Sequence, residues 1–259
     1  MDHLIYSHYF SLPTQGNIYT ITNLELANGT SKLLVASLKR EIFCFEYVEG
    51  TNGTLIPTAR EVSFTYIPTG AEIISIDAYN KSSKNNEFVV GITIIKNSND
   101  SDSLETYLNI YSGWEASEDF NIENIAQNCQ SLELNFIPYR LMHTDLFLWD
   151  NDGLCSQEKV FLLSGSDHYI HVFREGSDHL FKEVDAKEYF PEFIKHPSPV
   201  VWMDSMYINN DSDDVLKYGL SNYCSLPRHN PTNILTCCEI TDVDLDGKLE
   251  ILVGNSAKV

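Results

Sequence analysis

Basic residues are scarce in this sequence. Lys and Arg number 17 against 37 Asp and Glu, so the formal net charge is -20 over 259 residues. A field of this sign repels nucleic acids and anionic membrane surfaces, and it favours basic partners. We therefore expect no nucleic-acid binding. Because no apolar run approaches the ~18 residues of a membrane span, we expect no direct membrane insertion either.

Secretion signals and paired cysteines are also missing. The opening stretch MDHLIYSHYF has an early acid and lacks the basic segment and apolar run of a signal peptide. Adjacent Cys237 and Cys238 would point to opposite faces of a strand, which suits neither a disulfide nor a shared metal. No CxxC pair occurs among the six cysteines, which are Cys44, Cys129, Cys155, Cys224, Cys237 and Cys238. Reduced thiols fit a cytoplasmic protein, the localisation that we expect.

Catalytic motifs are lacking as well. The sequence has no GxSxG, no P-loop, no GxGxxG and no HExxH. We assign no catalytic residue and expect a protein that is not an enzyme.

A weak internal repeat is what the sequence does contain. Each copy opens with an apolar segment that ends on a polar anchor: Thr22, Asp77, Asp145, Asp204 and Asp242. Each copy then reaches a second apolar segment that closes on a small residue: Ala36, Gly91, Gly165, Gly219 and Gly254. Regularly repeated pairs of strands are typical of β-propeller blades, and the β-propeller is a scaffold that commonly binds partners.

Four strands per repeat are expected. LLVASL and EIFCFEYV predict a hairpin, and KVFLLSGSDHYIHVFRE predicts another around a turn at residues 165–167. EVSFTYIP and LELNFIP are predicted as outer fourth strands, since a final proline suits a sheet edge. FNIENIAQNC predicts a short helical segment.

The repeat is interrupted near its end. CSLPRHNPTN, which carries Pro227 and Pro231, cannot supply a central strand to the fourth copy. We expect an all-β fold with about three nearly whole four-stranded blades and two partial ones. Residues 1–259 are predicted to form a single incomplete β-propeller domain, with repeats starting near 17, 71, 138, 199 and 235.

The strongest local motif is DVDLDGKLE, which begins at Asp242. Its carboxylates occupy positions 1, 3, 5 and 9 of a calcium-type loop, as Asp242, Asp244, Asp246 and Glu250. Position 12 is Val253 instead of Glu, and the flanking segments are predicted strands, so an EF-hand is excluded. A strand–DxDxDG–strand loop is the FG-GAP arrangement. Two interpretations stay open: a cation site, and a β-turn held by Asx hydrogen bonds with no cofactor.

The repeated aspartates could be taken for a carboxylate cluster. They occupy equivalent places in successive repeats, so we expect Asp77, Asp145, Asp204 and Asp242 to lie far apart and to hold turn backbone. His143, next to an anchor, is expected to be a core or rim residue and not a base.

Several stretches resemble the kaptin family in sequence and order. They include REVSFTYIPTGAEIISIDAYNKS, FLLSGSDHYIHVF, YFPEF and CCEITDVDLDGKLEILVG. Compared with that family, we expect an internal deletion between the two matched regions and a shortened C-terminus. No residue of this chain can be assigned to partner binding from the resemblance.

The resemblance implies a non-catalytic scaffold subunit of the KICSTOR complex. Its implied partners are the other KICSTOR subunits, including an FG-GAP propeller protein, and the GATOR complex. That assembly holds the GATOR inhibitor at lysosomes and restrains target-of-rapamycin signalling when nutrients are scarce. A second role implied by the resemblance is association with actin filaments at the cell periphery. The negative charge argues against this role, because actin filaments are acidic too. A calcium-binding FG-GAP module is the third hypothesis.

Overall fold

The structure is a computed structural model. It describes residues 12, 14–37, 40–51, 53–98, 103–113, 121–149, 155–191, 193, 195–196, 198–205, 235–248 and 250–255. Within these residues the chain is built from β-sheets and two short helices.

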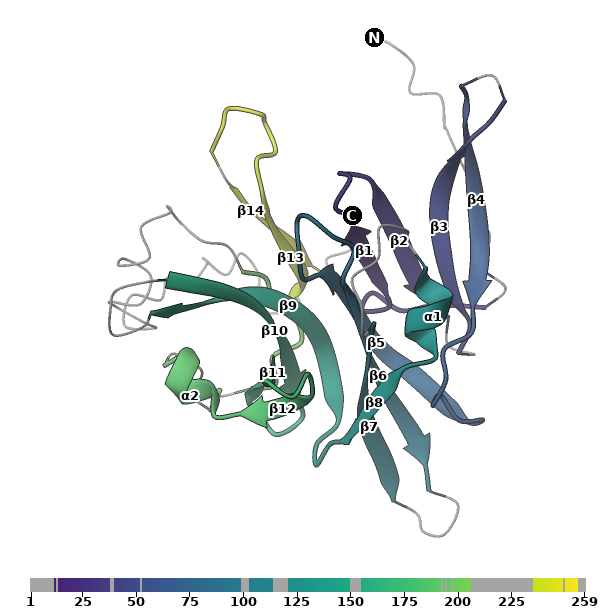
Figure 1. The fold of residues 1–259 in the computed structure, drawn as a ribbon. Helices are drawn as coiled ribbons and strands as arrows, with labels where there is room; N and C mark the ends of the chain where they lie inside the picture. Colours follow the sequence, from purple (N-terminus) through teal and green to yellow (C-terminus); the bar gives the residue numbers. More distant parts are fainter. Residues whose placement is uncertain are drawn as a thin grey trace. The chain divides into compact units, whose positions relative to one another are not determined.

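Three sheets have four strands each, hydrogen-bonded in chain order (Figure 1). The first contains β1 (Ile21–Glu25), β2 (Ser31–Ala36), β3 (Ile42–Glu49) and β4 (Leu55–Val62). The second contains β5 (Ala71–Asn80), β6 (Phe88–Asn97), β7 (Leu104–Ser112) and β8 (Cys129–Glu133), with helix α1 (Ile122–Ala126) between β7 and β8. The third contains β9 (Pro138–Trp149), β10 (Cys155–Gly165), β11 (Ile170–Glu175) and β12 (Phe181–Val184), followed by helix α2 (Ala186–Tyr189).

A fourth sheet has two strands, β13 (Leu235–Thr241) and β14 (Glu250–Asn255). Together these sheets confirm the predicted fold class, an all-β chain, with blade-like four-stranded sheets and one partial sheet among the described residues. The interrupted segment with Pro227 and Pro231, and the small residue Gly219, lie outside the described residues. No helix in the described part of the chain is long and apolar enough to cross a membrane.

The chain divides into two compact units, residues 1–143 and 144–259. Strand β9 crosses this boundary, so its first half belongs to one unit and its second half to the other. The prediction of a single domain stays a prediction.

The hairpins and the helical segment were predicted well, but the outer strands were not. β2 pairs with β3 and β10 with β11, and α1 lies inside the predicted helical stretch. β4, however, ends at Val62 and β8 at Glu133. The Ile67-Pro68 and Ile137-Pro138 pairs therefore follow the outer strands, where each leads into the next sheet. Pro68 lies within the connection to β5, and Pro138 is the first residue of β9, where proline is tolerated although it cannot donate a ladder hydrogen bond.

The first two sheets share one hydrophobic core. Leu34 and Ile42 of the first sheet and Ile76 and Ile92 of the second are fully buried members of one cluster. Strand β1 packs against β5 (Figure 1). A single shared core means that neither sheet buries its apolar face alone, as expected for stacked repeats.

Helix α1 joins the outer parts of these two sheets. Its capping residue Asn121 accepts a hydrogen bond from the backbone N–H of Asn124 at 3.1 Å. At its other end the Ala126 carbonyl accepts from both the backbone N–H and the hydroxyl of Thr65, each at 3.0 Å. Because Thr65 follows β4, these bonds tie the end of the first sheet to the second.

The second unit has its own aromatic packing. Phe161, Phe173 and Phe181, from β10, β11 and β12, are buried. The rings of Phe161 and Phe181 lie 5.9 Å apart. Successive strands of the third sheet therefore contribute to one core.

Thiol reactivity should follow burial. Burial raises the pKa of Cys44 and of Cys129 to about 11, whereas Cys155 and Cys237 are exposed. Because the thiolate is the nucleophile, we expect a maleimide at neutral pH to label the two exposed cysteines quickly, the partly buried Cys129 slowly, and the buried Cys44 only after unfolding. Mass spectrometry of a labelling time course measures this. Equal labelling rates for Cys44 and Cys155 in the native protein would contradict it.

The raised pKa of Cys44 and Cys129 also makes the stability of the fold depend on pH. Burial favours the neutral thiols, so their contribution to stability is complete below the ordinary pKa of 9.0 and is lost as the pH rises through about 11.

Candidate functional site

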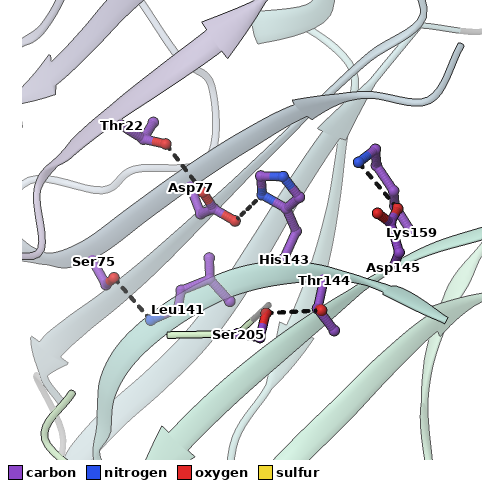
Figure 2. A network of polar contacts seen from close by, with 9 residues as sticks. All are labelled: Thr22, Ser75, Asp77, Leu141, His143, Thr144, Asp145, Lys159 and Ser205. Atoms are coloured by element: carbon purple, nitrogen blue, oxygen red, sulfur yellow. Dashed lines mark hydrogen bonds and ion pairs between the residues drawn. The ribbon is translucent and has the colours of Figure 1, made fainter. Parts of the chain in front are cut away.

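Some of the polar anchors join successive repeats, and Asp77 of β5 is the clearest case (Figure 2). The Thr22 hydroxyl donates to Asp77 Oδ1 at 3.0 Å, and His143 Nδ1 lies 2.8 Å from Asp77 Oδ2. Thr22 is in β1 and His143 is in the first half of β9. One carboxylate therefore connects the opening strands of three consecutive repeats.

Strand geometry explains why Asp77 can reach both partners. Asp77 lies opposite Gly91 of β6, which has no side chain to occupy the space beside the carboxylate. The Asp77 residue is 7% exposed, so its hydrogen bonds are shielded from water. The ring of Tyr79, two residues along the same strand, lies 5.0 Å from the His143 ring and supports it.

A second hydrogen bond joins the same two strands, β5 and β9. Ser75 Oγ accepts a hydrogen bond from the backbone N–H of Leu141 at 3.0 Å (Figure 2). Ser75 and Asp77 are two residues apart on β5, and so are Leu141 and His143 on β9. Because side chains two residues apart share a strand face, one face of β5 makes both contacts.

A β-bulge in β5 adds contacts to the first repeat. The pairing register shifts between Ile73 and Ser75, which leaves Ile74 outside the ladder. The Ile74 carbonyl accepts from Asn17 Nδ2 at 3.1 Å, and the Ile76 N–H donates to the Tyr19 carbonyl at 2.9 Å. The residues before β1 are thereby fixed to β5.

In the second unit, residues 201–205 also make polar contacts with neighbouring strands. Thr144 Oγ1 and Ser205 Oγ lie 3.0 Å apart (Figure 2). The Trp202 indole N–H donates to the Cys238 carbonyl at 2.7 Å, and Asp204 Oδ2 accepts from the Ile240 N–H at 3.0 Å. This segment, where the fourth repeat was predicted to start, thus links β9 to β13.

These contacts correct the expected role of the aspartates. Asp77 binds neighbouring repeats, and Asp145 forms an ion pair with Lys159 at 3.2 Å (Figure 2). Asp204 does both: its Oδ1 accepts from the backbone N–H of Ser205 at 2.8 Å, and its Oδ2 accepts from the Ile240 N–H. The expectation of turn bonding holds for Asp242, which accepts from the N–H groups of Asp246 and Gly247. His143 is partly buried, as expected for a core or rim residue, and it bonds to Asp77.

The DxDxDG loop brings three of the four predicted metal ligands together. Ligand oxygens of Asp242, Asp244 and Glu250 lie within 4.8 Å of one another. Asp246 is outside this group and pairs with Lys248, whose Nζ is 2.9 Å from Asp246 Oδ2. That side-chain hydrogen bond, with one from the Lys248 backbone, holds the pKa of Asp246 below its usual value.

The same carboxylates also hold the loop backbone. The Val243 N–H donates to Glu250 Oε2 at 2.9 Å, and the Asp246 N–H is 3.2 Å from Asp244 Oδ1. Gly247 has a φ of +85°, a left-handed conformation that side chains rarely adopt. Both interpretations of this loop, cation site and hydrogen-bonded turn, are therefore built from the same residues.

The fold and its inter-repeat contacts define a class of protein. The described residues form blade-like β-sheet repeats, and polar anchors such as Asp77 and Asp204 join neighbouring repeats. A family model described as "KICSTOR complex protein kaptin" matches residues 4–213 and 212–259. This chain belongs to the kaptin family.

A curated relative agrees with this assignment. The mouse (Mus musculus) KICSTOR complex protein kaptin is 38% identical over 202 residues, which cover 78% of this chain and 45% of the relative. The chain thus spans about half the length of the curated relative that it matches. No solved structure matches the chain.

Proposed function

We propose that this chain is a non-catalytic scaffold subunit that binds protein partners in a KICSTOR-type complex. The observation that carries the proposal is the kaptin family match, which covers residues 4–213 and 212–259. Stacked β-sheet repeats, such as the pair with a shared core here, present rigid surfaces and edges for binding. Their buried polar groups, such as Asp77, are used to hold repeats together and need no substrate to explain them.

The detailed form of this proposal concerns nutrient signalling. The proposed partners are the other KICSTOR subunits, including an FG-GAP propeller protein, and the GATOR complex. In this scheme the assembly brings the GATOR inhibitor to the lysosomal surface and restrains the target-of-rapamycin kinase on nutrient deprivation. The chain would be cytoplasmic and would reach the lysosome through its partners.

Affinity purification tests this function. The chain, tagged at its endogenous locus, should recover the other KICSTOR subunits from cells deprived of amino acids, and its deletion should leave the kinase active during deprivation. The Glu123→Ala variant, which removes an exposed ion pair with Arg60, serves as a control that should recover the same partners. Recovery of none of these subunits by the wild-type chain would overturn the proposal. Co-sedimentation with actin filaments at moderate salt would instead favour the cytoskeletal alternative.

We also propose that the DxDxDG loop binds Ca²⁺. Convergence of the Asp242, Asp244 and Glu250 oxygens favours this second function, because Ca²⁺ prefers carboxylate oxygens. Calorimetric titration with calcium chloride should release heat with the wild-type chain and none with Asp244→Ala. Asp178→Ala, which removes an exposed carboxylate paired with Lys182, is the matched control and should behave like wild type. Equal heats for wild type and Asp244→Ala would show that the loop is only a hydrogen-bonded turn.

A further inference from the structure

The ring of His171, on β11, lies between two carboxylates of the second unit. Its Nε2 is 3.0 Å from Oδ2 of Asp167, which lies in the turn between β10 and β11. Its Nδ1 is 2.7 Å from Oε1 of Glu183, on β12. The His171 side chain is 13% exposed, so water has little access to replace these contacts. One imidazole ring therefore links the turn to the last strand of the sheet.

The two contacts together require two protons on the ring. A carboxylate can only accept hydrogen bonds, and a neutral imidazole has one N–H and one lone pair. With a neutral ring, one nitrogen would direct its lone pair at a carboxylate oxygen. Carboxyl groups ordinarily lose their own proton near about pH 4, so above that pH the second proton must come from the ring. Both contacts of His171 are satisfied only when the ring is an imidazolium.

The other charged side chains of β10, β11 and β12 are paired elsewhere. On β10 the residue opposite His171 is the uncharged Leu163. The pairs are Lys159 with Asp145, Arg174 with Glu158, Glu175 with His179, and Lys182 with Asp178. After β12, Asp185 accepts from the backbone N–H of Lys187 and caps α2. Asp167 and Glu183 thus face the ring of His171 while the charges around them have their own partners.

The segment that begins at Glu183 is attached to the β10–β11 hairpin at three points. Residues 183–191, 193 and 195–196, here called the strap, include the helix α2. Glu183 contacts His171, and the Tyr189 hydroxyl accepts from Arg174 Nη1 at 3.1 Å. The backbone N–H of His196 donates to the carbonyl of His168, in the turn, at 2.9 Å. The hairpin therefore holds the strap at its start, in its helix and near its end.

Of these three attachments, the one through His171 depends on proton binding near neutral pH. The Arg174 guanidinium keeps its charge throughout. His168 uses its backbone carbonyl, and its Nδ1 lies 3.3 Å from the His196 carbonyl, a contact for which the single N–H of a neutral ring suffices. His171, by contrast, needs both ring protons.

We propose that His171 is a proton-dependent clasp that fastens the strap to the β10–β11 hairpin. When the ring is charged, Asp167 and Glu183 both accept from it, and the turn and β12 are held together. When the ring is neutral, one carboxylate loses its donor and the strap loosens. Histidine changes its charge between about pH 5 and 8, so the clasp is closed in the lower part of this range and opens as the pH rises. The device lies within one chain and is independent of the proposed scaffold function.

Amide exchange followed by NMR tests the clasp on the 259-residue chain. The Tyr169 N–H, which donates to Asp167 Oδ1, reports on the turn, and the Phe190 N–H, which donates to the Ala186 carbonyl, reports on the strap. After correction for the intrinsic effect of pH on exchange, the protection of both amides should fall by about threefold or more between about pH 6 and pH 8. Equal protection at the two pH values would overturn the proposal.

The Glu183→Gln variant separates a proton-dependent clasp from an ordinary structural contact. The glutamine amide can donate to the lone pair of a neutral ring, while the other ring nitrogen donates to Asp167. The clasp should then stay closed at about pH 8, so the protection of Phe190 there should exceed that of wild type, and its pH dependence should disappear. Protection below that of wild type at both pH values would show that the carboxylate is only a structural partner and would contradict the proposal.

Two further variants show which histidine binds the proton. His179→Gln replaces a histidine whose side chain is 75% exposed, and His168→Asn keeps a residue that tolerates the φ of +71° at that position. Both variants should retain the wild-type difference between the two pH values. Loss of the difference in either variant would assign the proton to that histidine and reject His171.

A measurement on the wild-type chain covers the case in which a variant does not fold. NMR of chain labelled with ¹⁵N-histidine distinguishes an imidazolium from a neutral ring. His171 should carry protons on both ring nitrogens at the pH at which the strap is protected, and on one at the pH at which protection is lost. A protected strap with a single proton on the His171 ring would overturn the proposal.

Discussion

Asp77→Ala is expected to lower the free energy of unfolding of the first unit by about 2–4 kcal/mol. The substitution removes the acceptor of both the Thr22 hydroxyl and His143 Nδ1. Because the site is nearly buried, water cannot fully replace the lost carboxylate, and two polar groups lose their partner. The opening strands of three repeats would lose their common contact.

Chemical denaturation followed by circular dichroism measures this loss. Asp77→Asn keeps the size and one acceptor oxygen, so its effect should be smaller than that of alanine. Glu123→Ala removes an ion pair whose side chains are 41% and 47% exposed, and it should cost less than about 1 kcal/mol. Similar losses for Asp77→Ala and Glu123→Ala would mean that the inter-repeat contact does not stabilise the unit.

Tyr111→Ala should lower the free energy of unfolding by about 3–5 kcal/mol, as large-to-small substitutions of buried aromatic residues do. Tyr111 is fully buried in β7, and its ring packs edge-on against Phe64 with centroids 4.8 Å apart. Its hydroxyl donates to the Thr65 carbonyl at 2.5 Å. The residue thus fills the core and also holds the segment that leads from the first sheet to the second.

Tyr111→Phe separates these two contributions. Phenylalanine keeps the ring but leaves the Thr65 carbonyl without this donor, so we expect the free energy of unfolding to fall by about 1–2 kcal/mol. Burial raises the pKa of the Tyr111 hydroxyl, so it stays protonated and able to donate throughout the range in which the protein is handled. Thermal and denaturant unfolding of the two variants give the comparison. An equal loss for Phe and Ala would show that ring packing contributes nothing.

Much of the fold was predictable because its elements are local. Alternating apolar residues predict β2, β3, β10 and β11, and their hairpins follow from short turns. The outer strands were placed too late in the sequence, since their boundaries depend on which residues the neighbouring sheet covers. β4 begins at Leu55, in a segment where exposed residues give little alternation. A weakly patterned edge strand is difficult to recognise from sequence alone.

The candidate sites were only partly predictable. The DxDxDG spacing placed Asp242, Asp244 and Glu250 on one loop, because the turn itself is local. The Asp77–His143 pair was missed, since these residues are far apart in sequence and meet only when β5 and β9 lie together. The sequence did contain a signal for this contact. Ser75 and Asp77 are two residues apart, as are Leu141 and His143, so each pair lies on one face of its strand and could meet the other strand together.

The central claim is that this chain is a scaffold subunit of a KICSTOR-type complex. Reconstitution from purified components tests this claim most directly. The 259-residue chain is mixed with the other purified KICSTOR subunits and analysed by size-exclusion chromatography with light scattering. The account predicts that the chain elutes with those subunits as one species of larger mass. Elution of the folded chain alone, at the mass of a monomer, beside an intact assembly of the other subunits, would contradict it.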